Sequence, residues 1–427
     1  MPSLKQGDRK MASKPKPQRT RQTAKQPISK PSNKDEQSPI DFTATIPLSI
    51  QQLLLDVFRT ALLPAHPTPT SEDATTTASA NLDTKTLIQT IKSHLYQRDF
   101  DSAFTEAGED LLRAYALRWS AARALGYAGL FKAVLRWMRE PEFSSDDQDA
   151  QRTRMNTRTR VVCIGGGAGA EIAALAAAWR SLDFGIEAVE TLKEQIAGVS
   201  LDEKEVEAGT LAEKSPQAVS SQLSVAAIDI ADWSSVVSRL EKGIASSAVP
   251  APKSSPYQPP LVPADLESGG FSVSFQRADV LGVSESDLKD VLLEPGSTPA
   301  ESPSLLVTLM FTLNELFSTS MAKTTGLLLR ITELLPPKAV LLVVDSPGSY
   351  STLKMGKGKD GAPQERKYPM KFLLDHTLLS VAEKKWERVY TQDSRWWRRD
   401  AARLRYDVGE GAGLEDMRFQ VHVYRRL

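Results

Sequence analysis

Cysteine and histidine are scarce in this chain of 427 residues, and their scarcity excludes two kinds of site. The single cysteine, Cys163, has no second thiol for an internal disulfide and cannot build a cysteine-cluster metal site. The four histidines are scattered without the spacing of a ligand set, so we expect neither a zinc enzyme nor another bound metal.

Long apolar runs are missing as well. No run of about 18 apolar residues is present to span a membrane, and the N-terminus lacks the apolar segment of a secretory signal. Apolar residues nevertheless make up 41% of the chain, which is enough for a sizeable core. The composition therefore predicts a soluble intracellular protein, with a length that corresponds to about two or three domains.

The charges balance overall but are unevenly placed. Residues 1–40 hold ten Lys or Arg against three carboxylates, a net charge of +7, so the remainder carries −7. This stretch has almost nothing to bury, which predicts a disordered basic tail. Such a tail can be simply solvated, and it can also be an arm for nucleic acid or a nuclear localisation signal; both readings can hold at once.

A helical N-terminal module is predicted over residues 46–138. An apolar stripe marks a helix in 46–64, and Asp83 is a candidate N-cap for a second helix. A Thr/Ser/Pro linker, 65–82, separates the two. Residues 101–138 lack proline and suit two or more helices. This part of the sequence indicates packing and no particular function.

Strand and helix patterns alternate over the predicted second domain, residues 155–427. A β-branched run is followed by a glycine-rich turn and a strong helix former, and the alternation continues to the end of the chain. It predicts a parallel α/β sheet with helices on both faces. The expected strands are 158–164, 223–229, 271–278, 305–311, 339–345 and 419–425, and the expected helices are 171–182, 233–242, 314–334 and 370–384. Low-complexity surface insertions are expected at 198–222 and 243–270.

The glycine-rich turn GGGAGAE fits two binding templates. Gly165, Gly167 and Ala170 match the dinucleotide pattern G-x-G-x-x-A. Gly165, Gly167 and Gly169 match the G-x-G-x-G loop of S-adenosylmethionine sites, in which the turn lies under the methionine part and the sugar of the ligand. A tight turn without any ligand is the third possibility. In either binding case the backbone approaches the ligand closely, next to a helix N-terminus.

Two aspartates at predicted strand ends help to choose between the templates. Asp229 can accept hydrogen bonds from both ribose hydroxyls, with Ile230 on the adenine face, or it can be a helix N-cap before Trp233. Asp279 can accept from the adenine amine, or it can be an ordinary turn residue. Asp183 lies nearer the offset of a dinucleotide site but follows no convincing strand.

Candidate catalytic groups follow the fourth and fifth predicted strands. Asn314 and Glu315, and then Asp345, fall at the carboxyl ends where open α/β sheets bind ligands. An amide and a carboxylate there can orient a flat base and take a proton, or they can cap the next helix. Downstream, residues 384–405 interleave Arg and Lys with three Trp. That mixture suits an RNA surface, or a solvated helix face with Trp in the core.

At these motifs the sequence resembles the class I S-adenosylmethionine-dependent methyltransferases, and more narrowly the fungal 25S ribosomal RNA uridine-N3 methyltransferase family. The resemblance covers roughly residues 83–427 and rests on VVCIGGGAGAEIAAL, IDIADW, RADVLG, TLMFTLNELFS, TQDSRWWRRDAARLRY and LEDMRFQVHVYRRL. In one departure, Cys163 stands where many class I enzymes have an acid that orients the methionine end.

The resemblance implies a Rossmann-like methyltransferase sheet, S-adenosylmethionine as co-substrate, a large-subunit ribosomal RNA or pre-ribosomal particle as partner, and action in the nucleus and nucleolus. Two alternatives stay open, a non-catalytic ribosome-assembly factor with this fold and an NAD(P)-dependent oxidoreductase. The predicted donor-binding residues are Gly165, Gly166, Gly167, Gly169, Glu171, Asp229, Ile230, Asp279 and Val280, and the predicted catalytic residues are Asn314, Glu315 and Asp345.

Overall fold

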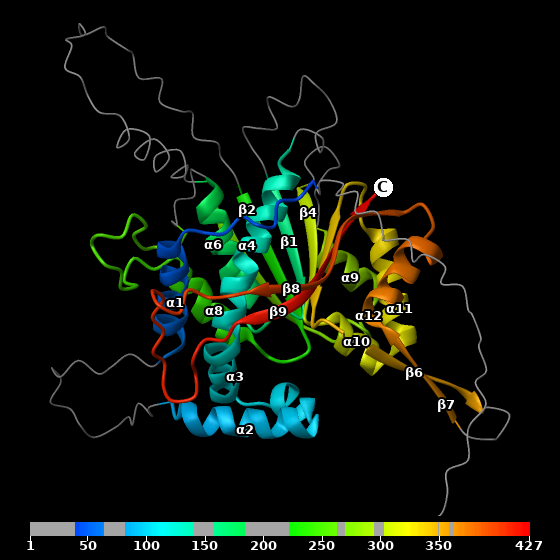
Figure 1. Cartoon of the computed structure of the whole chain (residues 1–427), viewed down its shortest axis with the longest axis horizontal. Coiled ribbons are helices and arrows are strands. Elements are labelled where there is room, and N and C mark those ends of the chain that lie inside the picture. Colours follow the sequence, from blue (N-terminus) through cyan, green and yellow to red (C-terminus); the bar gives the residue numbers. More distant parts are fainter. Residues whose placement is uncertain are drawn as a thin grey trace, which may run out of the picture. The chain divides into compact units, whose positions relative to one another are not determined.

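The computed structural model describes residues 39–63, 82–140, 158–183, 222–262, 270–293, 303–348, 350–357 and 363–427 (Figure 1). From Ser38 onward the chain forms one compact unit, so the N-terminal helices and the sheet are described together. The predicted basic tail and the predicted insertion at 198–222 lie outside the described residues, apart from one or two at their edges, and so does nearly all of the linker at 65–82.

One sheet of seven strands organises the described part of the chain (Figure 1). The first five strands run parallel, as the sequence predicts, whereas β9 is antiparallel to β5 and β8 is antiparallel to β9. The order across the sheet is β3 (Phe271–Arg277), β2 (Gln222–Asp229), β1 (Arg158–Ile164), β4 (Ser304–Met310), β5 (Val340–Asp345), β9 (Met417–Arg426) and β8 (Trp386–Trp397).

The strand order reverses at β1. The chain steps outward from β1 to β2 and β3, and then crosses back to place β4 on the other side of β1. In open α/β sheets, ligands bind at such a switch point, outside the carboxyl ends of the strands. The loops that follow β1 and β4 therefore frame the expected site.

Helices cover both faces of the sheet, and alternate residues of each inner strand enter two separate apolar clusters. Val161 and Cys163 of β1 belong to the first cluster, while Val162 and Ile164 belong to the second. The first face is covered by α1 (Leu48–Leu62), α4 (Ala121–Met138), α6 (Ala170–Asp183) and α8 (Ser234–Ile244), and the second by α9 (Glu285–Leu292), α11 (Met321–Leu334) and α12 (Met370–Asp375).

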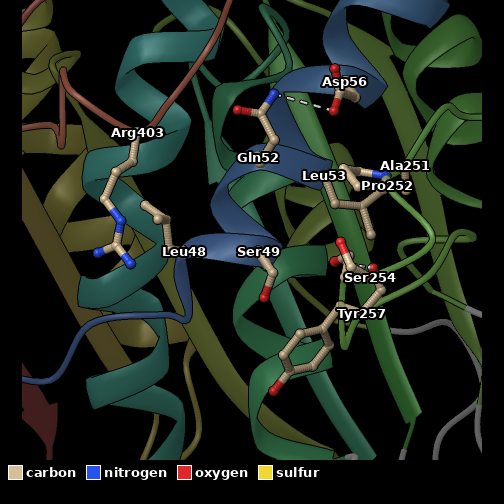
Figure 2. Close-up of a pocket in the computed structure, with 11 residues that line it drawn as sticks. Leu48, Ser49, Gln52, Leu53, Asp56, Ala251, Pro252, Ser254, Tyr257 and Arg403 are labelled. Carbon is tan, nitrogen blue, oxygen red and sulfur yellow. Dashed lines mark hydrogen bonds between the residues drawn. The ribbon is translucent and has the colours of Figure 1, made fainter.

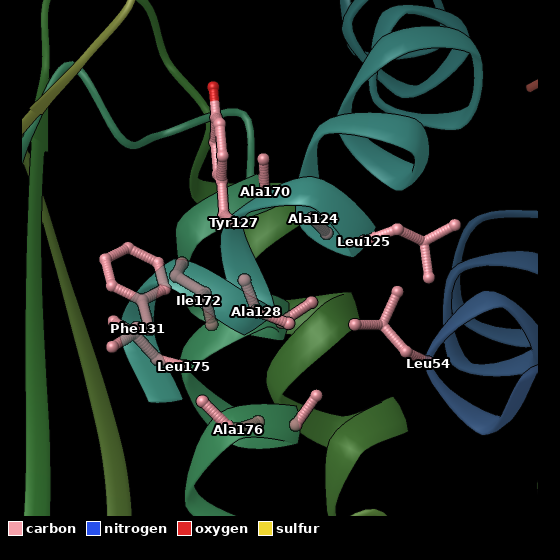
Figure 3. Close-up of a cluster of buried hydrophobic side chains, with 14 of the residues drawn as sticks. Leu54, Ala124, Leu125, Tyr127, Ala128, Phe131, Ala170, Ile172, Leu175 and Ala176 are labelled. Carbon is pink, nitrogen blue, oxygen red and sulfur yellow. The ribbon is translucent and has the colours of Figure 1, made fainter. Parts of the chain in front are cut away.

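The N-terminal helices share their core with the sheet. Figure 3 shows Leu54 of α1 facing Leu125 of α4, while Phe131 of α4 lies beside Ile172 and Leu175 of α6. The alanine-rich sequence of α6 has no bulky side chain on much of its surface, which lets α4 pack closely against it. These helices thus form one wall of the layered structure.

A nearly continuous helical stretch leads into α4. It begins with α2 (Thr84–Gln97) and the π-helical turn η1 (Asp101–Thr105), and continues through α3 (Glu109–Tyr115) and a second π turn, η2 (Ala116–Ser120). The predicted N-cap is confirmed, because the Asp83 carboxylate accepts a hydrogen bond from the main-chain nitrogen of Thr86. Arg277 at the end of β3 donates to the carbonyl of Thr105 at 3.4 Å, which places η1 at the carboxyl edge of the sheet.

Three predictions differ from the structure. The helix expected over 314–334 is two helices, α10 (Leu313–Thr319) and α11, because Ser320 is extended and caps α11 through Lys323. The helix expected over 370–384 is α12 followed by the π turn η5 (His376–Val381). In the segment predicted to be a surface insertion, Tyr257 and Leu261 are buried in the first apolar cluster. A further hairpin, β6 (Tyr350–Lys357) with β7 (Pro363–Pro369), and the long strand β8 were not predicted.

Candidate active site

The glycine turn between β1 and α6 is shaped by close neighbours. Gly165 has a φ of +79°, and a Cβ atom there would lie 2.4 Å from the hydroxyl of Thr312, just after β4. At Gly167 a Cβ atom would lie 2.2 Å from Cδ1 of Trp233. Side chains are therefore excluded for two reasons, left-handed backbone at the first position and close approach at the second. The turn brings the ends of β1, β2 and β4 together.

Asp229 lies at the end of β2, as predicted, and bonds to the glycine turn. Its Oδ2 accepts from the main-chain nitrogen of Gly167 at 3.1 Å, and its Oδ1 accepts from that of Ala231 at 3.2 Å. Burial raises the pKa of the carboxyl, while these two hydrogen bonds oppose the rise. The next residue, Ile230, leaves 49% of its surface exposed, an unusual fraction for a large apolar side chain at a strand end.

Glu171 lies underneath the turn instead of on its open side. Its Oε1 accepts from the hydroxyl of Thr308 on β4 at 2.6 Å, and the residue is 3% exposed. Burial raises the pKa of Glu171 to about 8, so the carboxyl is mostly protonated at neutral pH. The side chain also interacts with Cys163, where the resembling enzymes carry their acid, so a carboxyl group reaches this part of the sheet from α6.

The two residues after β3 that were predicted to lie near the adenine differ in their exposure to solvent. Asp279 is exposed after β3, and its Oδ1 accepts from the main-chain nitrogen of Leu281 at 2.9 Å. That bond is typical of a turn aspartate, and it leaves Oδ2 available to a ligand. Val280 is buried in the second apolar cluster, so only its main chain can face a ligand.

The three predicted catalytic residues gather at the carboxyl ends of β4 and β5. Asp345 is buried, and its two oxygens accept from the main-chain nitrogens of Asn314 (3.0 Å) and Ser346 (2.7 Å). Its carboxylate thereby caps α10. Glu315 is exposed in the first turn of α10, and the side-chain oxygen of Asn314 is enclosed without a hydrogen-bond partner.

Sequence reasoning missed a group of residues that the N-terminal helices bring to this edge. Arg123 of α4 donates to the hydroxyl of Tyr115 at 2.9 Å, and its guanidinium lies 5.3 Å from the ring centre of Phe311, directly after β4. Tyr115 in turn lies 5.7 Å from Trp233. The only local signal was the excess of Arg and aromatic residues in 112–131, which amphipathic helices also show.

The arginine- and tryptophan-rich segment 384–405 is a strand and a loop, so the helix-face reading is wrong. Trp386 is buried, as the helix-face reading expected of the Trp residues, and its indole nitrogen donates to the Thr332 hydroxyl. Trp396, in contrast, is 52% exposed. The guanidinium groups of Arg398 and Arg418 lie 4.9 and 5.9 Å from the Trp396 ring centre. Arg398 also pairs with the Asp416 carboxylate at 3.4 Å, and several other cations of the segment pair with carboxylates of the chain, namely Lys385, Arg388, Arg399 and Arg403.

A cavity of 460 Å³ lies away from the glycine turn, between α1 and residues 251–257 (Figure 2). Gln52 and Asp56 line it from α1 and are hydrogen-bonded to each other at 3.2 Å. None of the predicted site residues lines this cavity. Among the described residues no group of three or more His, Cys, Asp or Glu side chains is placed to hold a metal ion, and no described helix is long and apolar enough to cross a membrane.

The doubly wound sheet with its glycine turn under the switch point defines a class I S-adenosylmethionine-dependent methyltransferase. Residues 71–425 match the model of a family described as SAM-dependent methyltransferases, and the chain belongs to that family. It is 32% identical over 343 residues to the 25S rRNA (uridine(2843)-N(3))-methyltransferase of Saccharomyces cerevisiae, covering 79% of this chain and 76% of the yeast protein.

Two solved structures are more distant. A methyltransferase from Methanosarcina mazei is 9% identical with a TM-score of 0.28, and the match covers 63% of this chain and 92% of that one. An O-methyltransferase family protein from Burkholderia thailandensis is 12% identical with a TM-score of 0.28, and the match covers 87% of this chain and 82% of that one. These scores are low, so the fold assignment rests on the strand order and the family.

Proposed function

We propose that this protein transfers a methyl group from S-adenosylmethionine to N3 of a uridine in large-subunit ribosomal RNA. The observation that carries the proposal is the 32% identity with the yeast enzyme over most of both chains. Large-subunit RNA is assembled in the nucleolus, so we place the protein in the nucleus and nucleolus, acting on the RNA or a pre-ribosomal particle. The basic composition of residues 1–40 suits that setting.

The residues at the turn fit the methyl donor. The glycines leave room for a ligand over the backbone, the Asp229 carboxylate can accept from ribose hydroxyls, and exposed Ile230 offers an apolar surface to adenine. When bound, S-adenosylmethionine would supply a methyl group on a sulfonium sulfur, and the leaving group of the in-line displacement would be the neutral thioether S-adenosylhomocysteine. The protein's main task is to hold donor and acceptor in that line.

The acceptor needs a base, because uridine N3 carries a proton and becomes a good nucleophile only when that proton leaves. We assign this role to Glu315, which is exposed at the site edge with no partner for its carboxylate among the described residues. The enclosed amide of Asn314 can bond to the uracil edge. Asp345 has both oxygens engaged by main-chain nitrogens and therefore positions α10.

The target uridine must be unpaired or flipped out, since N3 lies on its pairing edge. Exposed Trp396, with Arg398 and Arg418 beside its ring, is suited to neighbouring unpaired bases and phosphates. All three residues lie where β8 ends and β9 begins, beyond the carboxyl end of β5, which is the same edge as the proposed catalytic residues.

Complementation tests the proposal directly. A yeast strain lacking the relative is given this chain, and 3-methyluridine in its 25S RNA is measured by mass spectrometry of the purified RNA fragment. We expect the modification to return with this chain and to stay absent with an Asp229→Ala variant expressed at the same level. If the chain and its Asp229→Ala variant both restore subunit assembly and neither restores methylation, the assembly-factor alternative is correct. Binding of S-adenosylhomocysteine in preference to NAD separates the methyltransferase from the oxidoreductase alternative.

A further inference from the structure

Arg123 is a partly buried cation without a counter-ion. Within the described part of the chain it forms no salt bridge, and its one hydrogen bond goes to the neutral hydroxyl of Tyr115 at 2.9 Å. A guanidinium removed from water is costly unless it is paired, so a structure that keeps one in place usually provides an anion. No described carboxylate supplies it.

Among the described residues, the groups that contact the guanidinium are aromatic rings, which attract a cation without carrying a full charge. The ring centres of Phe311 and Tyr115 lie 5.3 and 5.9 Å from it, at distances where aromatic rings interact with cations. The nearby carboxyl of Glu171 has a pKa of about 8 because of its burial, so it is mostly protonated at neutral pH and already bonds to Thr308. The site is therefore electrostatically incomplete.

Its neighbours place Arg123 over the glycine turn. Phe311 and Thr312 follow β4 at the switch point, and the Thr312 hydroxyl lies against Gly165. On the other side, Tyr115 packs on Trp233, which lies against Gly167. The Arg123–Tyr115 pair therefore lies over the glycine turn. In S-adenosylmethionine-binding loops of this kind, the turn lies under the methionine part of the ligand.

We propose that Arg123 binds the carboxylate of the methionine part of S-adenosylmethionine, and that Tyr115 holds the guanidinium in position. The planar guanidinium matches a carboxylate with two parallel hydrogen bonds. The π turn η2, which lies between the two residues along the chain, sets how α4 presents Arg123, and such turns recur at functional sites. The N-terminal helices then contribute directly to donor recognition. The inference depends on donor binding and not on which base accepts the methyl group.

Two ligands that differ only at the amino-acid end test the assignment. S-adenosylhomocysteine carries the carboxylate, whereas 5′-methylthioadenosine has the same adenosine and sulfur without it. Affinities of the purified full chain are measured by isothermal titration calorimetry. In Arg123→Met we expect the affinity for S-adenosylhomocysteine to fall about 10- to 100-fold, as for a lost charge-assisted pair, while that for 5′-methylthioadenosine stays within about twofold.

Three further variants separate this role from a structural one. Arg123→Lys keeps the charge, so it should fold and lose less of the preference for S-adenosylhomocysteine than Arg123→Met does. Tyr115→Phe keeps the ring and should cause a smaller, similarly selective loss. Arg136→Met removes an exposed arginine near the end of the same helix and should change neither affinity.

Equal losses for both ligands in Arg123→Met and Arg123→Lys, or no loss for S-adenosylhomocysteine, would overturn the proposal. Either result leaves the uridine assignment standing, since complementation measures that separately.

Discussion

The main-chain nitrogen of Gly167 donates to Oδ2 of Asp229 across 3.1 Å, although 62 positions separate the two residues in the chain. This bond joins the glycine turn after β1 to the end of β2 and fixes the carboxylate at the rim of the proposed donor site. The second oxygen is held by Ala231. A ligand that reaches both segments therefore meets a carboxylate already oriented by the backbone.

Asp229→Asn is expected to weaken donor binding. The amide keeps one acceptor oxygen for Gly167 but loses the charge and the second acceptor that two ribose hydroxyls require. We expect the dissociation constant for S-adenosylhomocysteine, measured by calorimetry, to rise about 10- to 100-fold. Asp232→Asn, which changes an exposed aspartate of the same loop, is the control and should bind as the wild type does. Equal affinity of the two variants would remove Asp229 from the site.

Gly167→Ala is expected to destabilise the fold. Its Cβ atom would meet Trp233 at 2.2 Å and the Cβ of Asp229 at 2.8 Å, neither of which is the free end of a flexible side chain. Overpacking of this kind costs about 1 to 3 kcal/mol in the free energy of unfolding, measured by urea titration. Gly326→Ala is the matched control, because nothing lies within 4 Å of the added atom in α11, and it should be neutral or stabilising.

Local signals in the sequence predict most of the sheet but not its far edge. The run RTRVVCI and the glycines after it give β1 and its turn at the right residues, because burial on both faces favours a continuous apolar strand. Strand β8 mixes Glu, Arg and Trp without clear alternation, and only its pairing with β9 makes it a strand. The break at Ser320 follows from a serine cap that competes with a continuous helix.

Part of the candidate site could likewise be predicted from local sequence signals, and part could not. The positions of Asp229 and Asp345 at the ends of β2 and β5 were predicted correctly, because the ends of buried strands can be recognised in the sequence. Arg123 was missed because its position depends on how α4 packs on α6 and on the π turn before it, which no local pattern specifies. The turn also depends on Trp233 and Thr312, whose contacts with glycine appear only in the folded chain.

Glu171 predicts a pH dependence of stability. Its pKa is about 8 in the folded protein against 4.5 as the ordinary value. Between these two values the folded state keeps a proton that the unfolded chain has lost. The contribution of Glu171 to the free energy of unfolding is therefore largest below pH 4.5 and is lost as the pH rises to about 8. The loss is on the order of 5 kcal/mol over that range.

Glu171→Gln should remove this dependence while keeping an acceptor for the Thr308 hydroxyl. Urea unfolding at several pH values should give a smaller decline in the free energy of unfolding between about pH 5 and pH 8 than the wild type shows. Exposed Glu333 provides the control, since Glu333→Gln should retain the decline. A Glu171→Gln curve parallel to that of the wild type would show that Glu171 ionises normally.

Glu315→Gln should slow the chemical step selectively. If Glu315 takes the N3 proton, turnover in a single-turnover assay with an RNA fragment should fall about 100-fold or more, with little change in S-adenosylhomocysteine affinity. Raising the pH should partly restore the rate of the variant, because more of the uridine is then deprotonated without a base. Glu333→Gln serves again as the control. An unchanged rate would assign proton removal to solvent or to another group.

Trp396→Ala should weaken RNA binding without affecting the donor. The ring is 52% exposed and has arginine groups 4.9 and 5.9 Å from its centre, so it can stack an unpaired base while the cations meet phosphates. We expect about a tenfold loss of affinity for a fragment containing the unpaired target region, and little change for a fully paired duplex. Val381→Ala removes an apolar side chain of the same exposed fraction, and should bind both RNAs normally. A similar loss for duplex and unpaired RNA would show that Trp396 supports the surface structurally and does not stack on a base.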